Sequence, residues 1–377
     1  MVEFSRRTLL SAGVGFVGTY SGSRSILGLS GPLKLTSDHP ATVLSSQAGT
    51  VDSREHATFA DFGGIGDGST NNAEAWQKIA DWASRGALAG NTPKIRVPAG
   101  RYVSTSIPNL AINRLHIEFE GEVWLINTGP GHSFVLDGGA NGAGAYGLRI
   151  TGWPQIYGTP NSLHGIYARA IFNSEMEFNC RGAGTLSAGL YSEWLGDNKI
   201  KFIMSSNEGG LYSKPTYGMH LTNRNDAEET SYNDIELKIS GTDTGIILDG
   251  ALGNNLRSGS IQNCRVGMYA TRKAWDNKLW GTDFESNGLD FVDTSRRLSF
   301  YGCDINTEGS FMRGSSGARV FGGRMESVTI SSGAQNVLLS GMGYNRTGVG
   351  KLNDSGTQTR YRDVLNIADR LLHDGPS

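Results

Sequence analysis

Four carboxyl groups and one guanidinium recur at matching positions in three similar segments of the sequence. The segments begin at Gly281, Gly302 and Gly322. Aligning them gives two columns of polar residues, Asp283, Asp304 and Arg324 in one and Glu285, Asn306 and Glu326 in the other. Glycoside hydrolysis requires two carboxyl groups, about 5 Å apart in a retaining enzyme or about 6.5 to 9.5 Å apart in an inverting one. The columns therefore predict an acid and a base made of Asp283 with Asp304, or of Glu285 with Glu326.

The same patch has a simpler interpretation, in which it is a solvated acidic surface with Arg324 as its counter-ion. In the catalytic interpretation, crowding of like charges raises the pKa of one carboxyl group, which leaves a proton donor at neutral pH. We expect no cofactor. Calcium is the alternative, because an acidic patch can also hold that ion.

A second set of residues suited to chemistry follows a repeated glycine phrase in the middle of the chain. Its outward positions form two columns, Tyr167, Tyr191, His220, Ile247 and Tyr269, and beside them Arg169, Glu193, Thr222, Asp249 and Thr271. Aromatic side chains along a groove bind sugars, and charged neighbours bind hydroxyl or carboxylate groups. Glu193 and Asp249 form a second candidate carboxylate pair, with His220 between them as an acid or base. The alternative is a ladder of aromatic residues that only stabilises the fold.

The elements that must position these residues repeat along the chain. A glycine followed by an alternating triplet occurs at Gly165, Gly189, Gly218, Gly245, Gly267 and Gly288, in steps of 24, 29, 27, 22 and 21 residues. This is the period of a solenoid, in which each coil is buried only by its neighbours. Asparagine precedes further alternating stretches at Asn233, Asn255, Asn277 and Asn336. Because Asn tolerates left-handed backbone, it suits the bends of coils built from two or three short parallel strands.

Composition and charge exclude several classes of function. The chain of 377 residues contains 53 glycines and 10 prolines and has a net charge of −2. We therefore expect neither a nucleic-acid partner nor a polybasic membrane-binding segment. Cys180, Cys264 and Cys303 are odd in number and lack metal-ligand spacing, so we predict neither a disulfide framework nor a zinc site.

The first residues predict export. The stretch Ser5-Arg6-Arg7-Thr8-Leu9-Leu10, followed by a short apolar run, looks like a twin-arginine signal. We predict that residues 1–55 are this signal peptide and a flexible linker. The protein is then periplasmic or extracellular, with no membrane contact after export.

Residues 56–377 are predicted to form a single domain with a helix near each end. Asn71 and Glu74 predict the start of an amphipathic helix over about residues 71–84, which would cap the first coil. Helical spacing over about residues 361–372 predicts a second helix, which would cover the last coil or meet another subunit. We expect a monomer or a homotrimer.

The beginning of this domain resembles a known group of proteins. Asp61–Gly68, a helix containing Ala75 and Gln77, and Val97–Tyr102 are similar to the opening of the pectate-lyase-like superfamily. This superfamily contains polygalacturonase-related hydrolases, polysaccharide lyases, uronan epimerases and tailspike depolymerases. The resemblance implies a right-handed parallel β-helix and a carbohydrate polymer as substrate. The active-site segments of polygalacturonases are missing, although Gly131-His132 and His164-Gly165 contain fragments of them.

Together these observations predict an exported all-β protein, a right-handed parallel β-helix that cleaves a polysaccharide by hydrolysis through a carboxylate pair. An alternative is a polysaccharide lyase or uronate epimerase, in which His220 or a tyrosine removes the C5 proton and Arg169 or Arg272 neutralises the uronate. Another alternative is a non-catalytic carbohydrate-binding or structural β-helix. The residues predicted to contact substrate are Tyr167, Arg169, Tyr191, Tyr269, Arg272 and Arg324.

Overall fold

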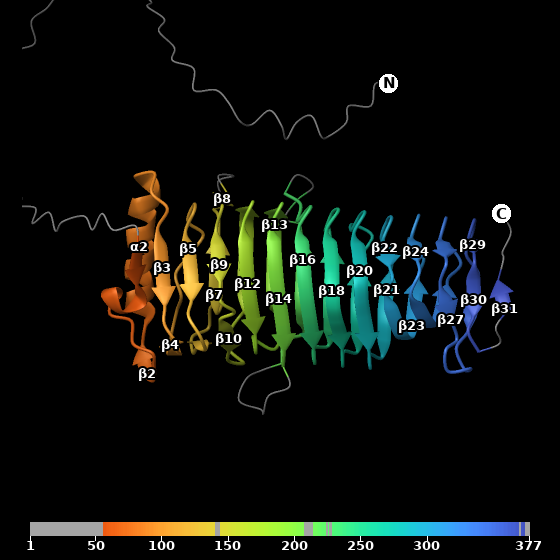
Figure 1. The fold of residues 1–377 in the computed structure, drawn as a ribbon, viewed down its shortest axis with the longest axis horizontal. Coiled ribbons are helices and arrows are strands. Elements are labelled where there is room, and N and C mark those ends of the chain that lie inside the picture. Colours follow the sequence, from red (N-terminus) through yellow and green to blue (C-terminus); the bar gives the residue numbers. More distant parts are fainter. Residues whose placement is uncertain are drawn as a thin grey trace, which may run out of the picture. The chain divides into compact units, whose positions relative to one another are not determined.

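The computed structural model describes residues 56–139, 144–206, 214–223, 225, 228–368 and 371–373. Residues Asp52–Ser377 form one compact unit. Within it, short strands follow one another in a right-handed coil, and each strand lies parallel to its equivalent in the next coil (Figure 1). The predicted parallel β-helix is confirmed. The predicted signal peptide and linker, residues 1–55, lie outside the described residues.

The strands form three parallel sheets, which we number by their order along a coil. The first sheet contains β1 (His56–Thr58), β3 (Lys94–Val97), β5 (His116–Phe119), β9 (Arg149–Thr151), β12 (Glu175–Cys180), β14 (Lys199–Ser205), β16 (Asp234–Ser240), β18 (Asn255–Gln262), β20 (Lys278–Glu285), β22 (Ser299–Tyr301), β24 (Arg319–Phe321), β26 (Leu338–Ser340) and β29 (Arg360–Arg362). The even-numbered strands from β12 to β20 continue into the second sheet, whose other members are β2 (Asp67–Asn71), β4 (Gly100–Ser104), β6 (Val123–Asn127), β10 (Gln155–Gly158), β23 (Asp304–Phe311), β25 (Arg324–Ile330), β27 (Gly343–Tyr344) and β30 (Val364–Asn366). The third sheet contains β7 (Phe134–Asp137), β11 (Ile166–Phe172), β13 (Ala188–Gly196), β15 (Tyr217–Thr222), β17 (Thr244–Asp249), β19 (Val266–Ala270), β21 (Leu289–Asp293), the ends of β23 and β25, and β28 (Leu352–Asp354), with β8 (Ala145–Tyr146) beside β11.

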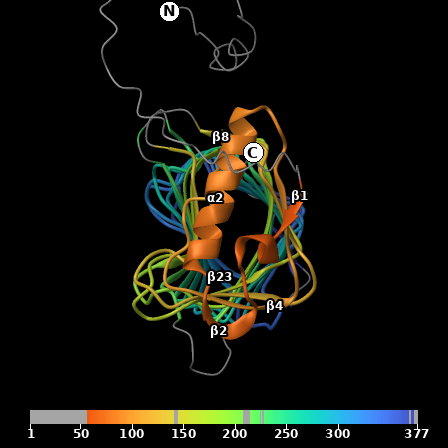
Figure 2. The ribbon, with the colours of Figure 1, turned by 90° about the vertical axis from the view of Figure 1, so that its left-hand side faces the viewer.

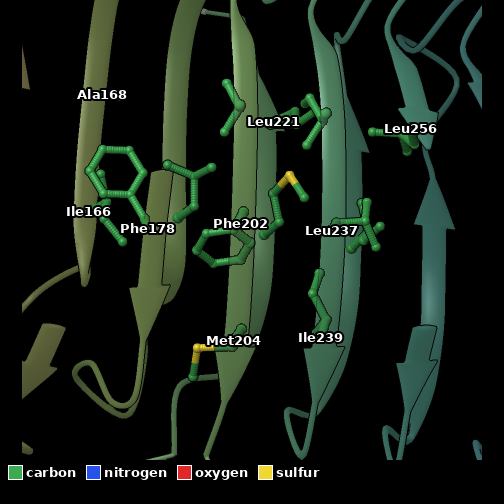
Figure 3. Close-up of a cluster of buried hydrophobic side chains, with 14 of the residues drawn as sticks. Ile166, Ala168, Phe178, Phe202, Met204, Leu221, Leu237, Ile239 and Leu256 are labelled. Carbon is green, nitrogen blue, oxygen red and sulfur yellow. The ribbon is translucent and has the colours of Figure 1, made fainter. Parts of the chain in front are cut away.

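Alternating burial explains why these segments are strands. In β14, Phe202 and Met204 point inward and are buried, while the residues between and beside them are partly exposed. This period of two is that of a strand with one face on the core. Figure 3 shows the interior, where Phe178 and Phe202 on one side meet Ile166 and Leu221 of the third sheet on the other. Truncating one of these buried phenylalanines to alanine would cost about 3–5 kcal/mol.

A ladder of buried asparagines supports the bend before the first sheet. Its members are Asn198, Asn233, Asn254 and Asn277. Each side-chain amide donates to the Oδ1 atom of the next member at 2.8–3.0 Å, and the same Oδ1 accepts a main-chain N–H at 3.0–3.1 Å. The sequence analysis placed Asn255 in this role, one residue too late. Left-handed backbone, which was predicted for the asparagines, occurs at Asn336 with φ 55°. In the ladder the preceding residues adopt it instead, such as Tyr232 at φ 57° and Asp276 at φ 55°.

The repeated glycines lie where an added side chain would collide with the core. A Cβ atom on Gly189 would lie 2.7 Å from Met204 Sδ, and one on Gly245 would lie 2.6 Å from Ile261 Cγ2. Gly288 does not belong to this column, because the pairing of β19 with β21 places Asp290 beside Gly267. The predicted alignment of the sixth coil is therefore shifted by two residues. A shift of two residues keeps every side chain on its own face of the strand. The alternation of buried and outward residues therefore cannot reveal it.

A helix covers the first coil, as predicted. Helix α2 (Ala73–Leu88) follows the short 3₁₀ helix η1 (Phe59–Phe62) and lies across the end of the coil (Figure 2). Its buried face includes Trp76, whose ring centroid lies 4.5 Å from that of Phe59. Glu74 pairs with Lys78 at 2.7 Å instead of closing a capping box. Among the described residues, no helix combines the length and the apolar character that crossing a bilayer requires.

The predicted C-terminal helix over about 361–372 is wrong. The chain instead forms β29, β30 and the last strand, β31 (Leu371–His373), which pairs antiparallel with β30. Val364 and Asn366 are buried and the residue between them is not, which is the period of a strand. The apolar spacing is compatible with a helix in isolation, but the open edge of β27 offers main-chain hydrogen bonds that only another strand can use.

Candidate functional site

The acidic residues of the second sheet have the register that the sequence alignment predicts. Asp283 pairs with Asp304, and Asp304 pairs with Arg324. The buried column behind them consists of Phe284, Ile305 and Met325. We call the outward residues of this region, from Asp283 to Glu326, the acidic face.

A bulge interrupts the neighbouring column of the acidic face. The register between β23 and β25 shifts after Ile305, so that Asn306 and Thr307 together stand opposite Glu326. Glu326 accepts hydrogen bonds from both the main-chain N–H and the hydroxyl of Thr347. The predicted continuous column of Glu285, Asn306 and Glu326 is therefore wrong.

Two other carboxylates of the acidic face, Asp304 and Asp283, have side-chain partners within it. Arg324 donates two hydrogen bonds to Asp304, with Nε 3.1 Å from Oδ1, and this pairing raises the pKa of the guanidinium. Asp283 accepts a hydrogen bond from the amide of Asn306 at 2.9 Å. Arg324 thus neutralises Asp304, whereas the partner of Asp283 is a neutral amide. Glu285 is exposed beside them.

The third sheet brings together the two columns that follow the glycine phrase. Tyr167 pairs with Tyr191, Tyr191 with His220, His220 with Ile247, and Ile247 with Tyr269. The second column runs through Arg169, Glu193, Thr222 and Asp249 in the same register. Thr271 follows, and its hydroxyl donates to Asp249 at 2.7 Å. We call this surface the ring face.

Two histidines complete the ring face and were not assigned to it from the sequence. His132 stacks on Tyr167 of the next coil with ring centroids 4.5 Å apart, and His164 stacks on Tyr191 at 4.3 Å. The Nδ1 atom of His132 accepts the main-chain N–H of His164 at 3.3 Å, and that of His164 accepts the N–H of Ala188 at 3.0 Å. Their position in the sequence could have revealed them, because both histidines lie just before strands of the third sheet. The sequence analysis treated them only as fragments of another motif.

Stacking determines which parts of these rings a ligand can reach. The planes of His164 and Tyr191 differ by 4°, and those of Tyr167 and Tyr191 by 9°. Because the rings lie nearly parallel and cover one another, they present edges and polar atoms outward. The Tyr191 hydroxyl, for example, donates to Glu193 at 3.0 Å. The expectation that Tyr167 and Tyr191 offer flat faces to sugars is therefore wrong.

The imidazoles of the ring face are neutral at physiological pH. Burial lowers the pKa of His132, His164 and His220, and that of His164 falls to about 4 because neighbouring imidazoles add to the effect. The main-chain hydrogen bonds require an unprotonated Nδ1 in His132 and His164, which places the proton of each neutral ring on Nε2. The Nε2 atom of His220 is buried and has no hydrogen-bond partner among the described residues.

Farther along the ring face, the surface is hollowed. A shallow depression of about 470 Å³ is lined by Thr216, Tyr217, Asp243, Thr244, Ile247, Arg265, Val266, Tyr269, Leu289 and Val292. Tyr269 is 37% exposed, and its neighbours in the column are Ile247 and Val292. Neither is aromatic, so no ring of the column covers Tyr269. At one side, Arg265 and Asp243 form a two-point ion pair at 2.9 and 3.0 Å.

The carboxylates of the ring face stand on alternate strands. Thr222 lies between Glu193 and Asp249, so strand spacing alone separates the two by about 9.6 Å. His220 occupies the intervening strand in the neighbouring column and meets the ring of Tyr191 at 89°. Asp249 is the next outward residue after Ile247, the residue of β17 that lines the depression beside Tyr269.

The two arginines predicted to bind a uronate are placed differently. Arg169 is committed to Asp137, with Nε 2.8 Å and Nη2 2.6 Å from the two carboxylate oxygens. This ion pair raises the pKa of the guanidinium. Arg272 lies beyond the end of β19 and donates to the main-chain oxygen of Arg313 at 3.4 Å. In the described part of the chain, no three His, Cys, Asp or Glu side chains are grouped to hold a metal ion.

No protein-family model matches the sequence, and no curated protein is significantly similar to it. Among solved structures, it is similar to PfbA, a surface adhesin of Streptococcus pneumoniae, with 13% identity and a TM-score of 0.52 over 85% of this chain and 95% of that one. It is also similar to ORF18 of Geobacillus virus E2, with 12% identity and a TM-score of 0.60 over 82% of this chain. The match spans 61% of that viral protein, which is less than two thirds. At this level of identity the likenesses show the fold alone, that of a parallel β-helix.

Proposed function

We propose that this protein binds a polysaccharide on the ring face and hydrolyses it with Glu193 and Asp249. The proposal rests on two features of the third sheet, the depression around Tyr269 and the two carboxylates on alternate strands. An apolar hollow with a few polar groups at its rim is the usual form of a small-molecule or sugar site. Tyr269 supplies the exposed ring on which a sugar can stack.

Charge on the ring face favours a neutral or weakly charged polysaccharide. Asp137 neutralises Arg169, and the three imidazoles are uncharged, so Glu193 and Asp249 leave the surface negative. A uronate beside Glu193 and Asp249 would meet like charges, and Arg169 is already paired with Asp137. This argues against the lyase or epimerase, which needs an unpaired arginine beside the uronate carboxylate.

The spacing of the two carboxylates supports an inverting mechanism. About 9.6 Å of strand separation leaves room for a water molecule between one carboxylate and the anomeric carbon. The Tyr191 hydroxyl donates to Glu193 and fixes the position of its carboxylate, so we assign Glu193 as the base that takes a proton from water. Asp249, two residues after Ile247 on the same strand, then donates a proton to the departing glycosidic oxygen.

The test is an assay of the purified full chain against neutral and acidic polysaccharides. New reducing ends and the ultraviolet absorbance of unsaturated uronates are followed together, with and without EDTA and added calcium. The proposal expects reducing ends without absorbance, on neutral polymers and without a calcium requirement. Absorbance would establish a lyase instead, and binding without any product would establish a carbohydrate-binding protein.

Matched variants locate the site. Glu193→Gln and Asp249→Asn should each lower kcat about 10²- to 10⁴-fold, because each removes one proton-transfer group. Glu285→Gln, on the acidic face, should leave kcat unchanged. Loss of activity in Glu285→Gln, with full activity in Glu193→Gln, would move the site to the acidic face and overturn the assignment.

A further inference from the structure

A second row of rings lies on the first sheet, away from the ring face. Trp280 pairs with Tyr301, and Tyr301 pairs with Phe321. The ring centroids of Trp280 and Tyr301 are 4.0 Å apart, and those of Tyr301 and Phe321 are 5.2 Å apart, with planes within 15° in both cases. Trp280 is 41% exposed, which is unusual for a side chain of this size on a folded surface.

Cations flank this row of rings. Two positions earlier on each strand, the outward column contains Lys278, Ser299, Arg319, Leu338 and Arg360 in register. Within the described residues, Lys278, Arg319 and Arg360 have no carboxylate partner in an ion pair. Basic residues nearer the start of the same sheet do have one, as in the pairs Lys94–Glu118, Lys201–Glu177 and Arg257–Asp234. We call Trp280, Tyr301 and Phe321 with these three cations the tryptophan platform.

The three cations stand on alternate coils. One strand separates Lys278 from Arg319, and one separates Arg319 from Arg360, so each step along the sheet is about 9.6 Å. A step of this size corresponds to two sugar units of an extended polysaccharide. The matching ligand is therefore a chain that carries one negative charge for every disaccharide.

We propose that the tryptophan platform is a second glycan-binding surface, which takes an acidic polysaccharide with one charged group per disaccharide. The unpaired cations bind the charged groups, while the exposed edges of the stacked rings contact the apolar side of the sugars between them. Ring stacking alone explains Tyr301, which is covered on both sides. It does not explain the exposed Trp280 at one end, nor Phe321 at the other, where the next residue of the column is Ser340.

The platform and the ring face differ in ligand preference. The ring face carries uncompensated carboxylates, whereas the platform carries uncompensated cations. The platform thus does not depend on the proposed hydrolysis at the ring face, and either function can fail without the other. One chain would hold an acidic polymer on the first sheet while acting on a neutral one on the third.

The experiment measures the Kd of the full chain for hyaluronan oligosaccharides, which carry one carboxylate per disaccharide, and for neutral dextran and single-stranded DNA. Hyaluronan should bind more tightly than both, and its affinity should fall as salt rises. Trp280→Ala should raise the Kd about tenfold, and Arg319→Gln about threefold to fivefold. The controls are Trp275→Ala, because Trp275 is equally exposed at 41% on a bend, and Arg149→Gln on the same sheet. Both should leave the Kd unchanged.

Three results would overturn the proposal. Equal binding of dextran would remove the role of charge, and equal binding of DNA would show a general polyanion surface. Self-association that sedimentation detects in the parent chain, and that Trp280→Ala abolishes, would show that a second copy occupies the platform. Thermal unfolding of each variant keeps a folding defect separate from a binding defect. Tyr269→Ala should leave hyaluronan binding intact, which separates the platform from the ring face.

Discussion

His164 should make the stability of the β-helix depend on pH, because its neutral form holds two coils together. Its Nδ1 atom accepts the main-chain N–H of Ala188, and its ring stacks on Tyr191. Protonation would place a hydrogen on Nδ1 and turn an acceptor into a donor that faces another donor. The informative change is His164→Gln, which offers an oxygen acceptor in a similar place but does not titrate.

The sign and size of the effect follow from the pKa of His164, which is about 4 in the folded chain and 6.5 when exposed. Between these values the unfolded chain binds the proton more tightly, so stability is complete above pH 6.5 and is lost as pH falls toward 4. The shift corresponds to about 3 kcal/mol in full, of which about 2 kcal/mol is lost at pH 5. Asp290 acts in the opposite direction, since burial raises its pKa to about 6 and its contribution is lost as pH rises toward that value.

Comparing the parent chain with His164→Gln cancels the contribution of Asp290. Urea unfolding followed by circular dichroism from pH 8 to pH 4.5 should show a steeper loss of stability in the parent by about 2 kcal/mol at pH 5. An NMR titration of the imidazole gives the pKa of His164 directly. Titration near pH 6.5, or identical pH profiles for the two proteins, would refute the reasoning.

Further predictions concern catalysis, folding and export. A Tyr269→Ala variant should raise the Kd for the polysaccharide of the ring face about tenfold, measured by calorimetry, and unchanged binding would contradict the role of the depression. An Asn254→Ala variant should lose about 2–4 kcal/mol in urea unfolding because it leaves buried amide and N–H groups unpaired, while Asn255→Ala should lose far less. Replacing Arg6 and Arg7 by lysine should retain the chain in the cytoplasm, as fractionation and immunoblotting would detect; normal export would refute the predicted signal.

The register of the third sheet was predictable because a physical constraint marks it in the sequence. Glycine is required wherever a Cβ atom would meet Met204 or Ile261, so successive glycines align successive coils. Once two glycines are aligned, the outward positions that follow must fall in columns, which is why Tyr191 and His220 pair as expected. Asp283 and Asp304 also pair as expected, since they follow Gly281 and Gly302 at equal distances, and there a positive φ of 58° and 61° favours glycine.

The predictions that are wrong concern segments whose structure is decided by a neighbouring strand in three dimensions rather than by the local sequence pattern. The bulge at Asn306 arises from the way β23 pairs with β25, and no residue type in β23 predicts it. The final residues have helical spacing, yet the free edge of β27 recruits them as a strand. His132 and His164 lie 32 residues apart in the chain and become neighbours only through the stacking of coils.

In a solenoid every outward residue belongs to some column, so a column of charges or rings is not by itself a site. A structural column differs from a binding site in that its side chains pair with one another by charge, hydrogen bonding or stacking. Asp304 and Arg324 neutralise each other on the acidic face, and His164 covers Tyr191 on the ring face. We expect ligand binding where a residue of a column lacks a partner within that column. Tyr269 is such a residue, because its ring is exposed beside the depression. Trp280 at the end of its own row meets the same criterion, which is why the two surfaces, rather than the more crowded acidic face, are assigned to ligands.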